Sequence, residues 1–187
     1  MCINTFPGLV LLALCAAWSG QARAAEEPTH PPAAERMPAN VQLVETVMRR
    51  EALHRLNSTT GVRLPRIRVF AANGDKLLYV VGWAKDVPAR LQRALQQQRP
   101  LPSGESLADL LAQIDDSAGQ PLTVEKLPPG DVVIVTAWAG WCLPCAPAIS
   151  GLRDAMAADS ARRYVWITVE TDAYKQKLLM PGARNGG

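Results

Sequence analysis

The sequence predicts an α/β protein, and three stretches carry that prediction. Residues 131–137 (DVVIVTA) are a continuous, mostly β-branched run, as expected for a strand buried on both faces of a parallel sheet. Residues 66–82 read as two strands joined at an Asn-Gly dipeptide, which is a strong hairpin signal. A helix is expected over 142–158 and a further strand over 164–170 (YVWITVE). A chain of 187 residues fits one domain with accessory segments.

The first 24 residues are predicted to be a secretory signal peptide and not part of the fold. An apolar run over 6–18 is followed by small residues, Ala22 and Ala24, at a plausible cleavage site. The run is too short to cross ~30 Å of hydrocarbon as a helix. We therefore expect a periplasmic or otherwise extracytoplasmic protein, with no stable membrane span in the mature chain.

Four further segments follow the signal peptide. Residues 25–39 are rich in Pro and Ala and are interpreted as a linker. Apolar residues recur at helical spacing over 40–60, which predicts an N-terminal helix with Asn40 as its cap. Residues 61–180 are assigned to the main domain, and 181–187 to a flexible tail.

Shorter helices are expected inside the main domain. Asp86 can cap a helix that runs to about Gln98, because Pro88 is tolerated in a first turn. Ser103 or Ser106 opens another helix that ends near Ile114. Residues 172–180 could form a last short helix before the tail.

Charge and cysteine content narrow the class of function. A formal net charge of only +3, with no long run of either sign, gives little support for nucleic-acid binding. Cys2 and Cys15 would leave with the signal peptide, so that the mature chain keeps Cys142 and Cys145. In an exported protein such a close pair meets conditions in which disulfides form and persist.

The pair lies in the stretch WAGWCLPC, directly after the predicted buried strand. A cysteine that opens a helix faces the positive end of the helix dipole, and this favours the reactive thiolate. Cys145 lies three residues further on the same face, where a Cα separation of about 5–6 Å suits a disulfide. The pattern predicts a pair that cycles between dithiol and disulfide, with Cys142 attacking, Cys145 resolving, and Pro144 stiffening the turn.

Three other interpretations of the pair remain open. A zinc site needs about four ligands, and His30 and His54 are distant from the cysteines and from each other. A purely structural disulfide in so short a loop would stabilise the fold only weakly. The third is an inactive pair left on a decayed domain. The alternative function is a binding or scaffold module whose cysteine pair is redox-silent. Neither a cofactor nor a metal is expected.

The stretch VVIVTAWAGWCLPC resembles the active-site segment of the thioredoxin superfamily, and most closely that of exported TlpA-type thiol–disulfide oxidoreductases. The similarity spans about Asp116 to Glu170. It implies a thioredoxin-like fold, exchange of disulfides with cysteine pairs of other proteins, and a redox partner protein. It also implies that Trp141 lines the site. Thr136 and Ser150 depart from the family, which often has an aspartate and a helix proline at these positions. The matching residues are Trp138, Ala139, Trp141, Cys142, Pro144 and Cys145.

The family fold also needs a cis-proline facing the disulfide, a β-hairpin and a final helix, and the chain after Cys145 is too short for them. The upstream segment 61–98 resembles this part in the spacing of Pro65, Gly74 and Gly82, although Arg66 replaces the usual threonine. The resemblance thus predicts a permuted order, with hairpin and helix first and the cysteine half second. Pro65 would be cis and beside the pair, and strand 66–70 would pair with 132–136. The alternative is a truncated domain with an added hairpin.

Overall fold

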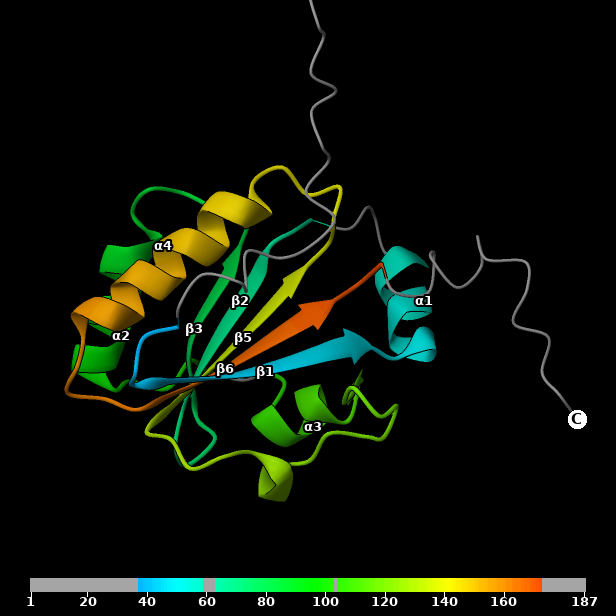
Figure 1. Cartoon of the computed structure of the whole chain (residues 1–187), viewed down its shortest axis with the longest axis horizontal. Coiled ribbons are helices and arrows are strands. Elements are labelled where there is room, and N and C mark those ends of the chain that lie inside the picture. The colour runs from blue at the N-terminus through cyan, green and yellow to red at the C-terminus, as the bar shows by residue number, and fades with distance from the viewer. Residues whose placement is uncertain (1–36, 59–62, 103, 173–187) are drawn as a thin grey trace, which may run out of the picture.

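The computed structural model describes residues 37–58, 63–102 and 104–172, and shows one mixed six-stranded sheet with helices on both faces (Figure 1). The predicted α/β class is confirmed. The strands lie in the order β3-β2-β5-β6-β1-β4. The predicted signal peptide, most of the linker, the last short helix and the tail lie outside the described residues. The elements are β1 (Val41–Met48), α1 (Arg50–Ser58), β2 (Arg66–Ala71), β3 (Lys76–Val81), α2 (Val87–Gln97), α3 (Leu107–Leu111), β4 (Ile114–Asp115), the 3₁₀ turn η2 (Val124–Lys126), β5 (Val132–Trp138), α4 (Cys145–Ala158) and β6 (Tyr164–Glu170).

The centre of the sheet is β5, and every one of its residues is buried. β6 pairs with it in parallel and β2 pairs with it antiparallel, with Arg66 opposite Ala137 and Phe70 opposite Val133. β3 forms one edge. The predicted pairing of strand 66–70 with the central strand is therefore confirmed. β6 lies on the other side of β5 from the hairpin.

The β2–β3 hairpin forms where the Asn73–Gly74 dipeptide predicts it. Gly74 has φ +86°, a left-handed conformation that glycine adopts without steric cost. The Asn73 side chain accepts a hydrogen bond from the Asp75 amide at 3.1 Å. A register shift between Val69 and Phe70 marks a β-bulge.

The prediction of an N-terminal helix over 40–60 is wrong for its first half. Residues Val41–Met48 form strand β1, which runs parallel to β6 along seven paired positions, and only Arg50–Ser58 are helical. The apolar spacing fitted a helix, but Val41, Val44 and Val47 are β-branched and lose less side-chain freedom in a strand. The long pairing with β6 decides the outcome.

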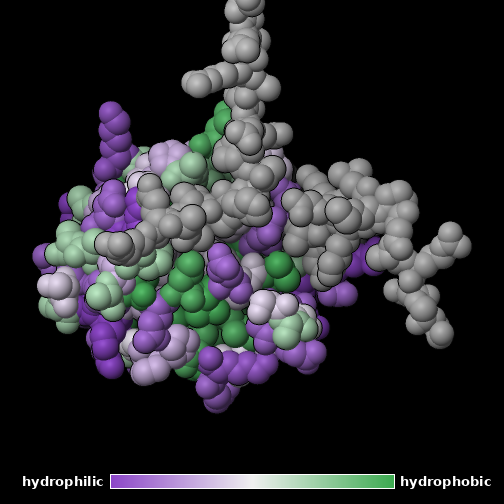
Figure 2. Space-filling model, in the orientation of Figure 1, coloured by the Kyte–Doolittle hydropathy of each residue, from purple (hydrophilic) through white to green (hydrophobic). Residues whose placement is uncertain are grey.

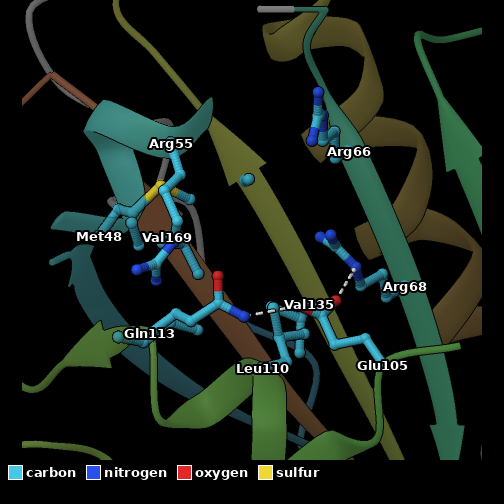
Figure 3. Close-up of a pocket in the computed structure, with 12 residues that line it drawn as sticks. Met48, Arg55, Arg66, Arg68, Glu105, Leu110, Gln113, Val135 and Val169 are labelled. Atoms are coloured by element: carbon cyan, nitrogen blue, oxygen red, sulfur yellow. Dashed lines mark hydrogen bonds and ion pairs between the residues drawn. The ribbon is translucent and has the colours of Figure 1, made fainter. Parts of the chain in front are cut away.

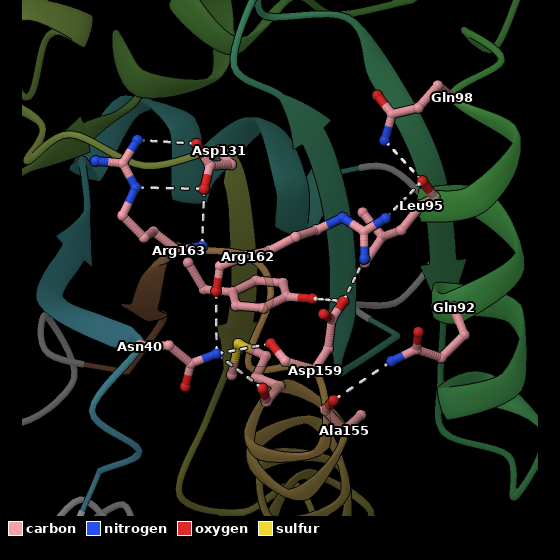
Figure 4. A network of polar contacts seen from close by, with 11 residues as sticks. Asn40, Gln92, Leu95, Gln98, Asp131, Ala155, Asp159, Arg162 and Arg163 are labelled. Atoms are coloured by element: carbon pink, nitrogen blue, oxygen red, sulfur yellow. Dashed lines mark hydrogen bonds and ion pairs between the residues drawn. The ribbon is translucent and has the colours of Figure 1, made fainter.

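Asn40 lies directly before β1 and is not the N-terminal cap of a helix (Figure 4). Its side-chain amide donates hydrogen bonds to the carbonyl oxygens of Met156, Asp159 and Arg162, at 3.0, 2.9 and 3.1 Å. These carbonyls belong to the end of α4 and to the connection that leads into β6. One side chain therefore holds three consecutive parts of the fold together.

The helices after the hairpin follow their predicted start signals. α2 begins directly after Asp86 with Pro88 in its first turn, although the Asp86 side chain makes no capping hydrogen bond. Ser106 caps α3 in a reciprocal capping box with Asp109. α3 ends at Leu111, before the predicted Ile114, because Ile114 pairs with Met48 of β1 as part of β4.

The helices form a layer on each side of the sheet. α2 and α4 lie together on one face, where the Gln92 side chain donates to the carbonyl of Ala155 at 3.4 Å, and α1 and α3 lie on the other (Figure 1). Figure 2 shows apolar atoms gathered in the middle of the visible face, over β1 and β6, with hydrophilic atoms around them. None of the helices in the described part of the chain is long and apolar enough to cross a membrane.

Candidate functional site

Cys142 and Cys145 lie just beyond the carboxyl end of β5, where the chain leaves the sheet. Their sulfur atoms are bonded at 2.02 Å, and their Cα atoms are 5.3 Å apart, within the separation predicted from the spacing. Two tight turns lead into the helix. The amide of Cys142 donates to the carbonyl of Ala139 at 3.0 Å, and the amide of Cys145 donates to that of Cys142 at 2.9 Å.

The helix after the cysteines begins three residues later than predicted. α4 starts at Cys145, with Pro144 as its cap residue, so that Cys142 lies in the turn before the helix. Pro144 has no N–H, and its ring limits the φ of the turn, as expected. Cys142 is 7% exposed and Cys145 is 2% exposed, which makes Cys142 the more accessible of the two.

The segment that contains Pro65 reaches the groove that Cys142 lines. The peptide bond between Leu64 and Pro65 is cis, as predicted. Leu64 and Cys142 line the same surface groove, of about 520 Å³, and the carbonyl of Pro65 accepts a hydrogen bond from the amide of Gly82 at 2.8 Å. The groove is lined by Arg63, Leu64, Val81, Gly82, Trp141, Cys142, Leu143 and Pro144.

Three of the residues that line the groove are exposed apolar side chains. Trp141 is 51% exposed and Leu143 is 90% exposed, and both belong to the cysteine turn. Val81, on the opposite wall, is also exposed. Trp141 therefore lines the site, as predicted, whereas Trp138 is buried in the core. Exposed apolar side chains that gather in one place are typical of surfaces that bind another molecule.

Thr171 and Asp172 hold the cysteine turn, and the sequence did not point to either. Asp172 Oδ1 accepts from the indole N–H of Trp141 at 2.9 Å, and its Oδ2 accepts from the amide of Gly140 at 3.1 Å. The amide and hydroxyl of Thr171 both donate to the carbonyl of Trp138, each at 2.9 Å. The only available signal was their position directly after a predicted strand that runs parallel to the cysteine strand.

A neutral side chain occupies the buried position in β5 six residues before Cys142. The hydroxyl oxygen of Thr136, which is fully buried, accepts a hydrogen bond from the indole N–H of Trp166 at 3.0 Å. In the described part of the chain the buried polar side chains are all threonines: Thr46, Thr136, Thr168 and Thr171. Among the described residues, no carboxylate or ammonium group is fully buried beside Thr136.

Comparison with known proteins finds no family model, no curated protein and no solved structure that matches the chain.

Proposed function

We propose that the protein is an exported thiol–disulfide oxidoreductase that exchanges disulfides with cysteine pairs of other proteins. The observation that carries the proposal is the Cys142–Cys145 disulfide at the start of α4, on the wall of an exposed apolar groove. A disulfide that only cross-linked the fold would gain nothing from such a surface, and one that closes so short a loop stabilises weakly.

The exchange needs only the two sulfurs of Cys142 and Cys145 and, on the substrate, a disulfide to reduce or a pair of thiols to oxidise. In the reducing direction the Cys142 thiolate attacks one sulfur of a substrate disulfide, and the other substrate sulfur leaves as a thiolate. The Cys145 thiolate then attacks Cys142, which releases the second substrate thiolate and restores the Cys142–Cys145 disulfide. Two electrons pass to the substrate, and a redox partner protein with its own cysteine pair returns them. The oxidising direction is the reverse.

We also propose that the fold is thioredoxin-like in permuted order. The arrangement that supports it is the β3-β2-β5-β6 part of the sheet, in which the hairpin and α2 precede the cysteine strand along the chain. The hairpin pairs directly with β5, and α2 packs beside α4. An appended hairpin on a truncated domain, which was the alternative, has no reason to complete the groove next to Cys142.

The groove suits a substrate segment in extended conformation. Leu64 lines the groove two residues before β2 begins, so that a substrate segment could pair with this stretch through main-chain hydrogen bonds. Trp141 and Leu143 would then contact apolar side chains that flank the substrate cysteine, while Arg63 at the rim favours acidic ones.

Trapping of mixed disulfides tests the proposal. Cys145→Ala removes the resolving thiol, so that the covalent intermediate on Cys142 accumulates in the exported fraction, as bands of higher mass on non-reducing gels that disappear with reductant. Cys142→Ala, the matched control, retains a single buried thiol and should trap little. If neither variant captures a client and the purified protein turns over no disulfide substrate, the pair is redox-silent and the protein is a binding or scaffold module.

A further inference from the structure

A second cavity, of about 340 Å³, lies on the sheet face that α1 and α3 flank, away from α4 (Figure 3). Its floor is apolar. Val135 and Ala137 of β5 lie there, whereas Thr136, between them, points to the opposite face. Met48, Leu110 and Val169 continue the apolar surface from three other elements. The volume is at the lower end of the range found for pockets that bind small molecules, about 300–1,000 Å³.

The polar side of this cavity carries more positive than negative charge. Arg66 and Arg68 come from alternate positions of β2 and Arg55 comes from α1, whereas Glu105 is the one acidic residue among the described residues that line it (Figure 3). Both oxygens of Glu105 are engaged. Oε2 lies 3.0 Å from Arg68 Nε, and Oε1 accepts from the Gln113 side-chain amide at 2.7 Å.

The two arginines of β2 keep hydrogen-bond donors available. Arg68 uses Nε toward Glu105, and Arg66 uses Nε toward the carbonyl of Arg63 at 3.3 Å. Within residues 37–58, 63–102 and 104–172, the terminal Nη1 and Nη2 atoms of both arginines donate no hydrogen bond. Planar guanidinium groups with open terminal donors are well suited to bind an oxyanion.

Arg68 is also held in place before any ligand arrives. Its side chain is only 14% exposed, and the guanidinium carbon lies 5.1 Å from the centre of the Tyr79 ring, on the directly paired residue of β3. The cation–π contact and the Glu105 ion pair together fix its orientation. A guanidinium group fixed in this way loses little conformational entropy when it binds an anion.

From this combination we propose that the cavity binds a small organic anion with an apolar body, such as a medium-chain carboxylate. The apolar chain packs against Val135, Ala137 and Val169, and the anionic head accepts hydrogen bonds from Arg66 and Arg68. The site lies on the other face of the sheet from α4 and uses neither cysteine, so that it is independent of the proposed redox function.

Titration of the ¹⁵N-labelled mature protein with octanoate tests this inference. Amide resonances of residues that line the cavity should shift saturably, those of Met48, Leu110 and Val169 included. Octanol, which has the same chain without the charge, should bind at least about tenfold more weakly, because charge-assisted hydrogen bonds to the head are lost. Inorganic phosphate, which has no apolar body, should leave these resonances unshifted. Equal binding of octanol, or equal binding of phosphate, would overturn the proposal.

Variants identify the head-binding residues. Arg66→Met should weaken octanoate binding about tenfold, since it removes one donor group without breaking an ion pair. Arg68→Met combined with Glu105→Gln, which leaves no charge unpaired, should do the same. Arg93→Met, on the exposed side of α2, is the matched control and should leave binding unchanged. Contacts between the Leu178 or Leu179 methyl groups and Val169, without any octanoate shift, would mean that the chain's own C-terminal segment fills the cavity, and would refute the site.

Discussion

Among single residues, Asp172 has the most direct hold on the cysteine turn. Its two oxygens accept hydrogen bonds from the Trp141 indole and the Gly140 amide, and both donors lie within two residues of Cys142. Because the carboxylate comes from the end of β6, the turn is tied to a strand of the sheet. A rigid turn would keep the Cys142 sulfur in place for the proposed exchange.

Asp172→Ala should loosen this turn. We expect the indole ¹⁵N–¹H resonance of Trp141 to move and the Gly140 amide to exchange with solvent about tenfold faster, because each loses a charge-assisted acceptor. Both are measured by NMR on the oxidised protein. Asp154→Ala removes a carboxylate from the exposed side of α4 and is the matched control. Unchanged exchange at Gly140 in Asp172→Ala would show that Thr171 alone holds the turn.

At the scale of the elements, the hairpin could be predicted from the sequence and β1 could not. The β2–β3 turn depends on Asn73 and Gly74, two neighbouring residues, so that a short stretch of sequence is enough to predict it. The conformation of residues 41–48 depends on pairing with β6, where the hydroxyl of Thr46 donates to the carbonyl of Thr168 across a sequence separation of 122 residues. The apolar spacing of this segment fits a helix, and no local signal shows the partner strand.

The Asn40 side chain should contribute strongly to the attachment of β1. Asn40→Ala should lower the free energy of unfolding by about 1–3 kcal/mol, because three carbonyls at the end of α4 and before β6 lose their donor. Urea denaturation of the oxidised protein measures the change. Gln42→Ala, at an exposed position of β1, is the control and should stay within about 0.5 kcal/mol of the wild type. An equal effect of both substitutions would contradict a special role for Asn40.

At the scale of the whole molecule, an ion pair at the start of the two central strands makes stability depend on pH (Figure 4). Asp131, before β5, accepts hydrogen bonds from the side chain and amide of Arg163, before β6. The side-chain hydrogen bond from Arg163 is the main cause that lowers the pKa of Asp131 from 3.8 to about 2. A carboxyl whose pKa is lower in the folded state stabilises the fold above its unfolded pKa, and this contribution is lost as the pH falls toward 2.

Asp131→Asn should therefore destabilise the protein near neutral pH, and the difference from the wild type should shrink as the pH falls from 4 to 2. Chemical denaturation at a series of pH values measures this difference. Asp154→Asn removes one exposed carboxylate elsewhere and is the control for net charge. A difference for Asp131→Asn that stays constant over this range would show that the Arg163 contact does not depend on the charge of Asp131.

The positions of the cysteine pair, Pro144, Trp141 and the cis proline at 65 could be predicted from the sequence, because each residue belongs to a short pattern with recognisable spacing. The residues that complete the site around them could not be predicted. Asp172 meets Trp141 only because β5 and β6 run in parallel and end together. The cavity of about 340 Å³ likewise depends on the approach of α1 and α3 to the same face, which no local pattern contains.

The strand order has a consequence for the time course of synthesis. β5 and β6 occupy the middle of the sheet, yet all the other strands precede them along the chain. A growing chain that has reached residue 131 therefore has two separate groups of strands, β2 with β3 and β1 with β4, and no hydrogen-bonded ladder joins them. The central strands of the sheet are therefore the last to be synthesised. The last of them, β6, is also the strand with which β1 pairs. Until Tyr164–Glu170 have emerged, β1 and β5 each lack their common partner, so that the six-stranded sheet cannot be completed before this strand is available.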